Sequence, residues 1–432
     1  MRRHVFASSV PVILLGMVPG ILIAQTDRTE YLERARELLR ESPLIDGHND
    51  LPWEARINYG LGLDSLDIAQ RQDSTMTDIP RLREGLVGGQ FWVAYVPSSF
   101  HHRGAPRVGM EQVDFIHQMV ERYHDLEFAG TADEVVAAFE SGRVASLIGL
   151  EGGHIIENSL GLLRQFYDRG VRYMTLTHSR NTDWADASTD SLEHGGLTAF
   201  GEEVVHEMNR LGMMVDLSHV SDSTMWDVLR VTHAPVIFSH SSARHFTPHR
   251  RNVPDDVLRA VAENDGVVMV NYVTSFIYLP TYEWEERSSL VRDSLVEAMG
   301  EGEASQALFE VWREANERPL PGIETVADHI EHIRDVAGID HVGIGADLDG
   351  IGSTPIGLED VSTFPDLIAE LLARGWEDEE IHQFTGRNIL RVMRAVERVA
   401  TELQATTSPS TARIEEVDHW AFETEWREPR ED

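Results

Sequence analysis

Cysteine and lysine are both absent from the 432-residue sequence. Without cysteine the chain has no thiolate zinc ligand, no cysteine nucleophile and no structural disulfide. Without lysine all 37 basic residues are arginines, which excludes a Schiff-base lysine, a P-loop lysine and a carbamylated lysine that bridges two metals. A metal site in this chain would therefore consist of histidine and carboxylate ligands.

Positive charge is scarce, and so are long apolar runs. The 73 acidic residues outnumber the basic ones and give a net charge of −36, which argues against nucleic acid or an anionic membrane surface as a partner. Residues 1–25 have a basic start, an apolar stretch and Ala24 before a plausible cleavage point. Because the stretch is shorter than the ~20 residues that span a bilayer, it predicts a signal peptide and an exported, periplasmic or secreted protein without a membrane anchor.

Short aliphatic runs alternate with longer amphipathic segments from residue 44 to residue 350, which is typical of βαβα proteins. Eight runs are predicted strands: 44–48, 88–96, 144–153, 173–179, 213–219, 235–241, 266–272 and 341–350. Helical patterns between them include 113–124, 131–142, 159–170, 200–212 and 254–264. Since no GxGxxG follows the first strand, an α/β fold with a closed (β/α)8 TIM-like barrel is favoured over an open doubly wound sheet.

Two segments exceed the minimal barrel. The sequence predicts a charged helical insertion over residues 276–320, after the seventh strand, which could form a lid over the pocket. It also predicts helices over residues 359–403 that close the barrel domain. The predicted organisation is a signal peptide over 1–25, one barrel domain over 26–404 and an acidic, flexible tail over 405–432.

Reactive side chains end most of the predicted strands, and in such a barrel the active site lies at the carboxyl ends. They are His48, Asp50, Glu151, His178, His219, His240 and Asp347. His48 and Asp50 alone are explained equally by a turn, although side chains two apart share one face of a strand. Four histidines together with carboxylates indicate a catalytic centre for zinc or another borderline divalent metal. Only Glu151 or an aspartate could bridge two ions, so a binuclear centre about 3.5 Å across, holding a hydroxide, is predicted.

Seven stretches carry a resemblance to a known family: DGHNDLPW (46–53), LEGGH (150–154), RYMTLTHSRNTDWAD (172–186), VDLSHVS (215–221), PVIFSHSSAR (235–244), RRNVPDD (250–256) and GIGADLDG (343–350). In unbroken order over residues 30–400, they resemble the membrane (renal) dipeptidase family of dizinc peptidases. The resemblance implies a homodimeric enzyme with two Zn²⁺ that hydrolyses dipeptides, including those with a D-residue at the carboxyl side.

The metal ligands follow from this resemblance, position by position. It makes His48 and Asp50 ligands of one zinc, and His219 and His240 ligands of the other. Glu151 would bridge the two ions.

The resemblance also implies three roles in catalysis and substrate binding. His178 would stabilise the oxyanion that develops on the scissile carbonyl. Asp347 would take a proton from the bridging water and pass it to the leaving amine. Arg251 would hold the free carboxylate of the dipeptide by a bidentate contact, which explains a preference for dipeptides.

Other polar and aromatic residues have simpler explanations. The pair His101 and His102 is predicted to be structural or solvent-exposed in a loop, and His329 and His332 are predicted to lie on an outer helix. His154 and Asp216 are expected to contact the metal ligands from outside and to fix their orientation. For three tryptophans, Trp53, Trp92 and Trp184, the sequence leaves open whether they line the pocket or only pack against their neighbours.

Two alternative functions remain open from the residues. Another metal-dependent (β/α)8 amidohydrolase, of the lactonase or deaminase type, commonly has His-x-His on its first strand, whereas this chain has His48-x-Asp50. An inactive exported protein that binds metal or peptide would not need Glu151, His178 or Asp347.

Overall fold

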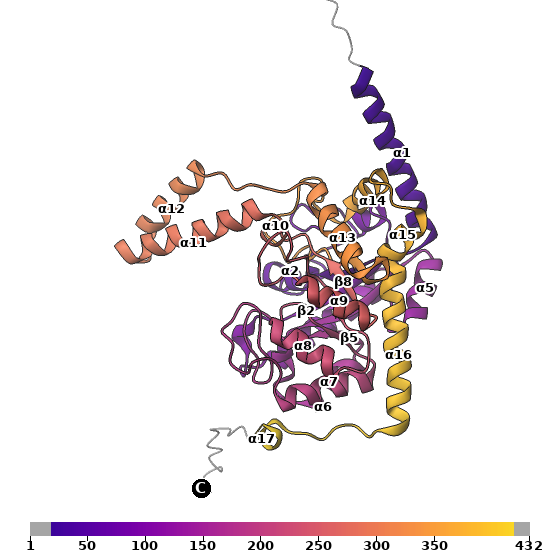
Figure 1. The fold of residues 1–432 in the computed structure, drawn as a ribbon, viewed down its shortest axis with the longest axis vertical. Coiled ribbons are helices and arrows are strands. Elements are labelled where there is room, and N and C mark those ends of the chain that lie inside the picture. The colour runs from indigo at the N-terminus through magenta and orange to yellow at the C-terminus, as the bar shows by residue number, and fades with distance from the viewer. Residues whose placement is uncertain (1–18, 419–432) are drawn as a thin grey trace, which may run out of the picture.

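The computed structural model describes residues 19–418, and its centre is a closed barrel of parallel strands (Figure 1). The strands are β1 (Leu44–Asn49), β2 (Val87–Tyr95), β3 (Leu126–Phe128), β4 (Val144–Glu151), β5 (Val171–Thr175), β6 (Met214–Asp216), β7 (Ile237–Phe238), β8 (Val267–Val270) and β9 (Val342–Ile344). Their order is β2-β1-β9-β8-β7-β6-β5-β4-β3, and β2 also pairs with β4. All strands except β3 thus form a closed ring, which confirms the predicted (β/α)8 barrel.

The barrel strands are apolar because both of their faces are covered. Every residue of β4 and of β8 is buried, as expected of parallel strands enclosed by helices. The longest register joins β2 to β4 from the pair Gly89 and Ala145 to the pair Tyr95 and Glu151. This register brings Glu151 to the carboxyl end of the barrel beside Tyr95.

Several strands are shorter than predicted. The strand expected over 213–219 ends at Asp216, where the side chain replaces the ladder: its Oδ1 accepts the backbone N–H groups of Ser218 (3.0 Å) and Ser239 (2.9 Å). The short strand β3 was not predicted. It pairs only with the amino-terminal part of β4, opposite residues 144–146, and its three residues carry no alternating pattern.

Helices surround the barrel. They are α1 (Pro19–Glu41), α2 (Leu51–Tyr59), α3 (Ile79–Glu84), α4 (Ala105–Arg122), α5 (Ala132–Glu140), α6 (Leu160–Asp168), α7 (Ala199–Leu211), α8 (Asp222–Val231), α9 (Asp255–Glu263), α10 (Thr274–Ile277), α11 (Leu279–Met299), α12 (Glu303–Ala315), α13 (Ile323–Ala337), α14 (Phe364–Ala373), α15 (Asp378–His382), α16 (Asn388–Thr406) and α17 (Ile414–Val417). The predicted helices coincide with α4, α5, α6, α7 and α9 to within a few residues at most ends. No helix of the described residues is long and apolar enough to cross a membrane.

The predicted insertion follows β8, the seventh strand of the ring, and is helical as expected. Its helices α11 and α12 lie side by side and extend away from the barrel (Figure 1). The indole of Trp284 on α11 donates to the carbonyl of Asn316 after α12 (2.8 Å). This bond ties the two ends of the insertion together near the barrel.

The chain returns to α7 after α16. Ser410 donates its backbone N–H to Glu207 (3.2 Å), and Asp418 accepts from the hydroxyl of Thr198 (2.6 Å) and the N–H of Phe200 (3.0 Å). The first part of the predicted tail over 405–432 therefore packs against the barrel domain. The rest of it, from residue 419, and the first 18 residues of the predicted signal peptide lie outside the described residues, so the domain boundaries stay predictions.

Candidate active site

The residues predicted to form the site gather at the carboxyl ends of the barrel strands. All of them except His48 line one cavity of about 1060 Å³: Asp50, Glu151, His178, His219, His240, Arg251 and Asp347. His48 is fully buried against this group. The barrel thus brings together residues that are up to three hundred positions apart in the sequence.

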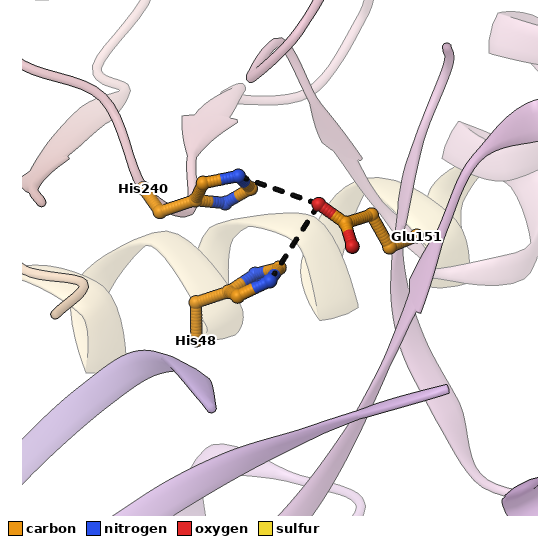
Figure 2. Close-up of side chains that lie close together, drawn as sticks. All are labelled: His48, Glu151 and His240. Atoms are coloured by element: carbon orange, nitrogen blue, oxygen red, sulfur yellow. Dashed lines mark ion pairs between the residues drawn. The ribbon is translucent and has the colours of Figure 1, made fainter. Parts of the chain in front are cut away.

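Glu151 lies among three histidines. Its Oε1 atom is 3.0 Å from Nε2 of His219, 3.4 Å from that of His240 and 3.6 Å from that of His48. Figure 2 shows the imidazole rings of His48 and His240 on the same side of this carboxylate and directed at it; their planes are tilted by 43°. The Nε2 atoms of His219 and His240 are 3.0 Å apart. Donors that share a tetrahedral zinc ion, with bonds of ~2.0–2.1 Å, lie at roughly such separations.

A second group of donors adjoins the first through His48. Its Nε2 atom is 3.3 Å from Oδ2 of Asp50 and 4.0 Å from Oδ1 of Asp347. These three residues each offer a ligand atom within 4.8 Å of the other two. Two adjoining donor groups are what a two-metal site requires.

Hydrogen bonds between these donor atoms do not account for their arrangement, whereas a bound metal would. Nε2 of His48 and Oδ1 of Asp50 are buried and have no hydrogen-bond partner. Burial without a partner is costly for polar atoms, so such atoms call for an explanation. A set of imidazole nitrogens and carboxylate oxygens with no thiolate is the donor chemistry of a catalytic zinc site.

Buried hydrogen bonds at the Nδ1 atoms fix the orientation of the His48 and His240 rings. Nδ1 of His48 is 3.0 Å from the hydroxyl of Tyr173, which itself donates to the carbonyl of Gly47. Nδ1 of His240 is 2.8 Å from the hydroxyl of Ser239, which donates to Asp216 (2.6 Å). Partners of this kind fix the ring orientation and leave Nε2 directed into the site.

Tyr173 and Ser239 were missed by the sequence analysis, which expected only Asp216 and His154 in such positions. A signal for Tyr173 exists in the sequence, because glycine inside a strand often marks a close approach. Gly149 pairs with Tyr173 across β4 and β5, and a Cβ on Gly149 would lie 2.2 Å from the Tyr173 ring.

The loops after β6 and β9 have an unusual backbone at the site. His219 and Asp347 both have positive φ angles, 72° and 64°, which are uncommon for residues other than glycine. Gly350 packs directly on the carboxylates: a Cβ there would lie 2.2 Å from Oδ2 of Asp50 and 2.8 Å from Oδ1 of Asp347. Only glycine leaves room for these two carboxylates.

Burial dominates the proton affinities of the site. Burial raises the pKa of Glu151 to about 8 and that of Asp347 to about 7; in both cases the charge of His48 opposes this rise and the charge of Asp50 adds to it. Burial would lower the pKa of His48, but Glu151 and Asp50 oppose it and raise that pKa to about 10. The pKa of His178 is lowered to about 3 by burial and by the charge of Arg251, so this imidazole is neutral at neutral pH.

Arg251 is the buried member of the pair Arg250 and Arg251. Only 3% of it is exposed, and its guanidinium makes two long hydrogen bonds, of 3.3 Å each, to the hydroxyl of Ser241 and the carbonyl of His240. Its Nε atom has no partner. Burial lowers the pKa of Arg251 to about 10, which keeps it charged at neutral pH with donors free for a ligand.

The other histidines and tryptophans considered in the sequence take different positions, and only some of them reach the site. His329 is buried behind the barrel mouth, where Nδ1 accepts from the N–H of Ala243 (3.1 Å) and Nε2 contacts the carbonyl of Ile277 (2.9 Å). Trp53 lines the cavity, whereas Trp92 and Trp184 are fully buried.

Comparison with known proteins gives the chain relatives over nearly its whole length. Residues 32–407 match the family described as "Membrane dipeptidase (Peptidase family M19)". Dipeptidase verJ of Clonostachys rogersoniana is 43% identical over 415 residues, which cover 93% of this chain and 95% of the relative. Dipeptidase 3 of Mus musculus is 43% identical over 372 residues, which cover 85% of this chain and 67% of the relative.

Solved structures agree with this match. The probable dipeptidase PvdM from Pseudomonas aeruginosa superposes with a TM-score of 0.75 at 21% identity, over 86% of this chain and 100% of its own, and supports the fold. A metallo peptidase from Rhodobacter sphaeroides, solved with a phosphinate mimic of the dipeptide L-Ala-D-Ala, has a TM-score of 0.66 and 26% identity over 82% of this chain and 99% of its own. These matches show that the chain belongs to the membrane dipeptidase family, peptidase family M19, a family of metallo-dipeptidases, and the barrel with its cluster of candidate metal ligands agrees with this membership.

Proposed function

We propose that this chain is a zinc-dependent dipeptidase whose centre holds two zinc ions and whose substrates include dipeptides with a D-residue at the carboxyl side. The observation that carries the proposal is the convergence of His48, Asp50, Glu151, His219 and His240 at one barrel mouth, with donor atoms 3.0–3.6 Å apart around Glu151. Family membership favours this function over a lactonase, a deaminase or an inactive binding protein. When bound, the two ions would lower the pKa of the attacking water and polarise the scissile carbonyl.

Substrate binding is assigned to Arg251. Its charged, buried guanidinium has donors to spare and lines the same cavity as the metal-binding residues. A carboxylate matches the fork of donors in a guanidinium bidentately. A dipeptide has its carboxylate one residue beyond the scissile bond, whereas a longer peptide has none at that distance. The relative solved with an L-Ala-D-Ala mimic supports D-residues at this position.

Asp347 and His178 are assigned to the chemical step. As the water oxygen bonds to the carbonyl carbon, Asp347 accepts the water proton, and it delivers this proton to the amide nitrogen as the C–N bond breaks. Asp347 lines the same cavity as Glu151, and its Oδ1 lies 4.0 Å from Nε2 of His48, so its carboxylate can reach a water held among these residues. The neutral imidazole of His178 can donate an N–H to the oxygen that gains negative charge.

A panel of L,L- and L,D-dipeptides tests the proposal when the purified protein is assayed before chelation, after chelation and after zinc is restored. We expect dipeptides to be cleaved, activity to vanish with the metal and return with zinc, and tripeptides and dipeptide amides to be poor substrates. Activity that survives complete metal removal, or equal turnover of tripeptides, would contradict it. Export and a homodimeric assembly stay predictions from the sequence.

A further inference from the structure

Three loops meet at Asp183, away from the residues assigned to catalysis. The loop after β2 brings His101 and His102, a turn after β4 brings Asn158, and Asp183 itself lies in the loop after β5. Oδ2 of Asp183 is 2.8 Å from Nε2 of His102 and 3.3 Å from Nε2 of His101. The same oxygen accepts from the amide of Asn158 (2.6 Å).

The two histidines are arranged as paired donors. Their rings stack at 4.1 Å with an interplanar angle of 21°, and their nitrogens and the Asp183 carboxylate all lie within 4.8 Å of one another. The separations of 2.8 and 3.3 Å resemble those around Glu151, which run from 3.0 to 3.6 Å. By distance, the Asp183 cluster is as compact as the cluster that family membership identifies with metal binding.

A hydrogen-bond network explains only part of this cluster. The Nε2 atom of His101 is buried and makes no hydrogen bond, although the carboxylate oxygen is 3.3 Å away. A simple imidazole–carboxylate pair would place the N–H of His101 in line with that oxygen. His102 has a positive φ of 55°, uncommon for a residue other than glycine, and this backbone places the two consecutive rings on the same side.

We propose that His101, His102 and Asp183 bind a further divalent ion of the zinc class. Two imidazole nitrogens and one carboxylate oxygen are ligands suited to such an ion, with a fourth position left for water. Asn158 would orient the carboxylate from outside, as the outer partners of metal ligands do. A cavity of about 730 Å³ adjoins the cluster and is lined by His101 and Asp183, which gives the ion a path from solvent.

The ion would tie together loops that carry the active site. The loop after β2 follows Tyr95, the turn with Asn158 follows Glu151, and the loop with Asp183 includes His178. The hydroxyls of Ser98 and Ser179 also form a hydrogen bond between the first and third loops (2.9 Å). The ion would therefore hold these loops together, in a chain that has no cysteine for a disulfide.

Zinc stoichiometry tests this proposal in the intact protein. The wild-type protein and the variants His102→Gln and His332→Gln are dialysed against buffered zinc and analysed for bound metal, and their melting temperatures are compared with and without zinc. His102 is suited to replacement because 40% of its side chain is exposed. His332 is a matched control: it lies 2.8 Å from Asp255 and stacks on His245 at 4.2 Å, so it has a similar donor set at another place. Unlike His101, neither His245 nor His332 has a buried nitrogen without a hydrogen-bond partner, so the hydrogen bonds of this cluster account for its geometry.

We expect His102→Gln to bind one zinc ion fewer per chain than the wild type, and to gain less in melting temperature from added zinc, whereas His332→Gln matches the wild type. Equal zinc content in His102→Gln and the wild type would overturn the proposal, and so would a loss confined to His332→Gln. If His102→Gln does not fold, His101→Gln gives the same comparison. The difference of one ion does not depend on how many ions the active site holds, so this test fails or succeeds separately from the proposed dipeptidase activity.

Discussion

Replacing Arg251 with methionine should abolish the recognition of the substrate carboxylate while leaving the metal-binding side chains in place. Methionine keeps much of the length of the side chain and removes its charge and all of its donors. In the structure the guanidinium gives only two hydrogen bonds, both at 3.3 Å, which is longer than the usual 2.9–3.0 Å. Little stability should therefore be lost from these two contacts.

The expected magnitude follows from the bonds that a carboxylate would make. Hydrogen bonds to charged groups contribute about 1.5–3 kcal/mol each, so a bidentate contact to a buried guanidinium should be worth about 3–6 kcal/mol. This corresponds to a roughly 10²- to 10⁴-fold loss in kcat/KM. Since the contact is present before and during the reaction, the loss should fall mainly on KM.

Steady-state kinetics with a dipeptide and with the matching dipeptide amide isolates this contact. The wild type should discriminate strongly against the amide, because the amide lacks the carboxylate, and Arg251→Met should treat both substrates alike. The coupling between the two changes then gives the energy of the contact without the general cost of the substitution. Arg250→Met is the matched control, because Arg250 is exposed and adjacent in the chain, and it should behave like the wild type.

The reasoning would be refuted if Arg251→Met still favoured the dipeptide over its amide by the wild-type factor. In that case some other group would hold the carboxylate, and the preference for dipeptides would have another origin. A loss of discrimination in Arg250→Met instead would show that the wrong arginine was chosen.

Three further predictions concern catalysis, the insertion and pH. Asp347→Asn should retain bound zinc and lower kcat by roughly 10²- to 10⁴-fold, as expected when a proton-transfer group is removed; unchanged turnover would contradict its role. Arg318 lines the cavity and bonds to Ser353 (2.7 Å) and Thr274 (2.8 Å) at the base of the insertion, so Arg318→Ala should raise KM. Arg287→Ala, at an exposed position of α11 that does not line this cavity, should leave KM unchanged. Burial lowers the pKa of His329 to about 4, so its contribution to stability is full above pH ~6.5 and is lost as the pH falls from about 6.5 to about 4. In urea unfolding at pH 7 and pH 4.5, His329→Gln should therefore lose less stability on acidification than the wild type, and an equal loss would count against this assignment.

The sequence predicted the barrel because its signals are strong and local. The strand β4 is a nearly continuous apolar run that ends in Glu151, and two glycines follow it. The convergence of the site follows from the barrel itself, since parallel strands bring all of their carboxyl ends to one mouth. A histidine or carboxylate at a predicted strand end could therefore be placed without knowing its neighbours.

The features that escaped prediction depend on contacts between distant segments. The hydroxyl of Tyr173 behind His48 is visible only when β1 and β5 face each other across the barrel, and Asp183 meets His101 only through the folding of two loops. The insertion was recognised as helical, but its extension away from the barrel (Figure 1) depends on packing between α11 and α12 that periodicity does not reveal. The end of β6 was misjudged because the Asp216 side chain takes over the hydrogen bonds of the strand.

Anomalous diffraction at the zinc edge from crystals of the zinc-loaded protein tests the central claim most directly. The account predicts two adjacent peaks in the active-site cavity, one bound by His48 and Asp50, the other by His219 and His240, and both in contact with Glu151. A single peak there, or no peak within reach of Glu151, would contradict it.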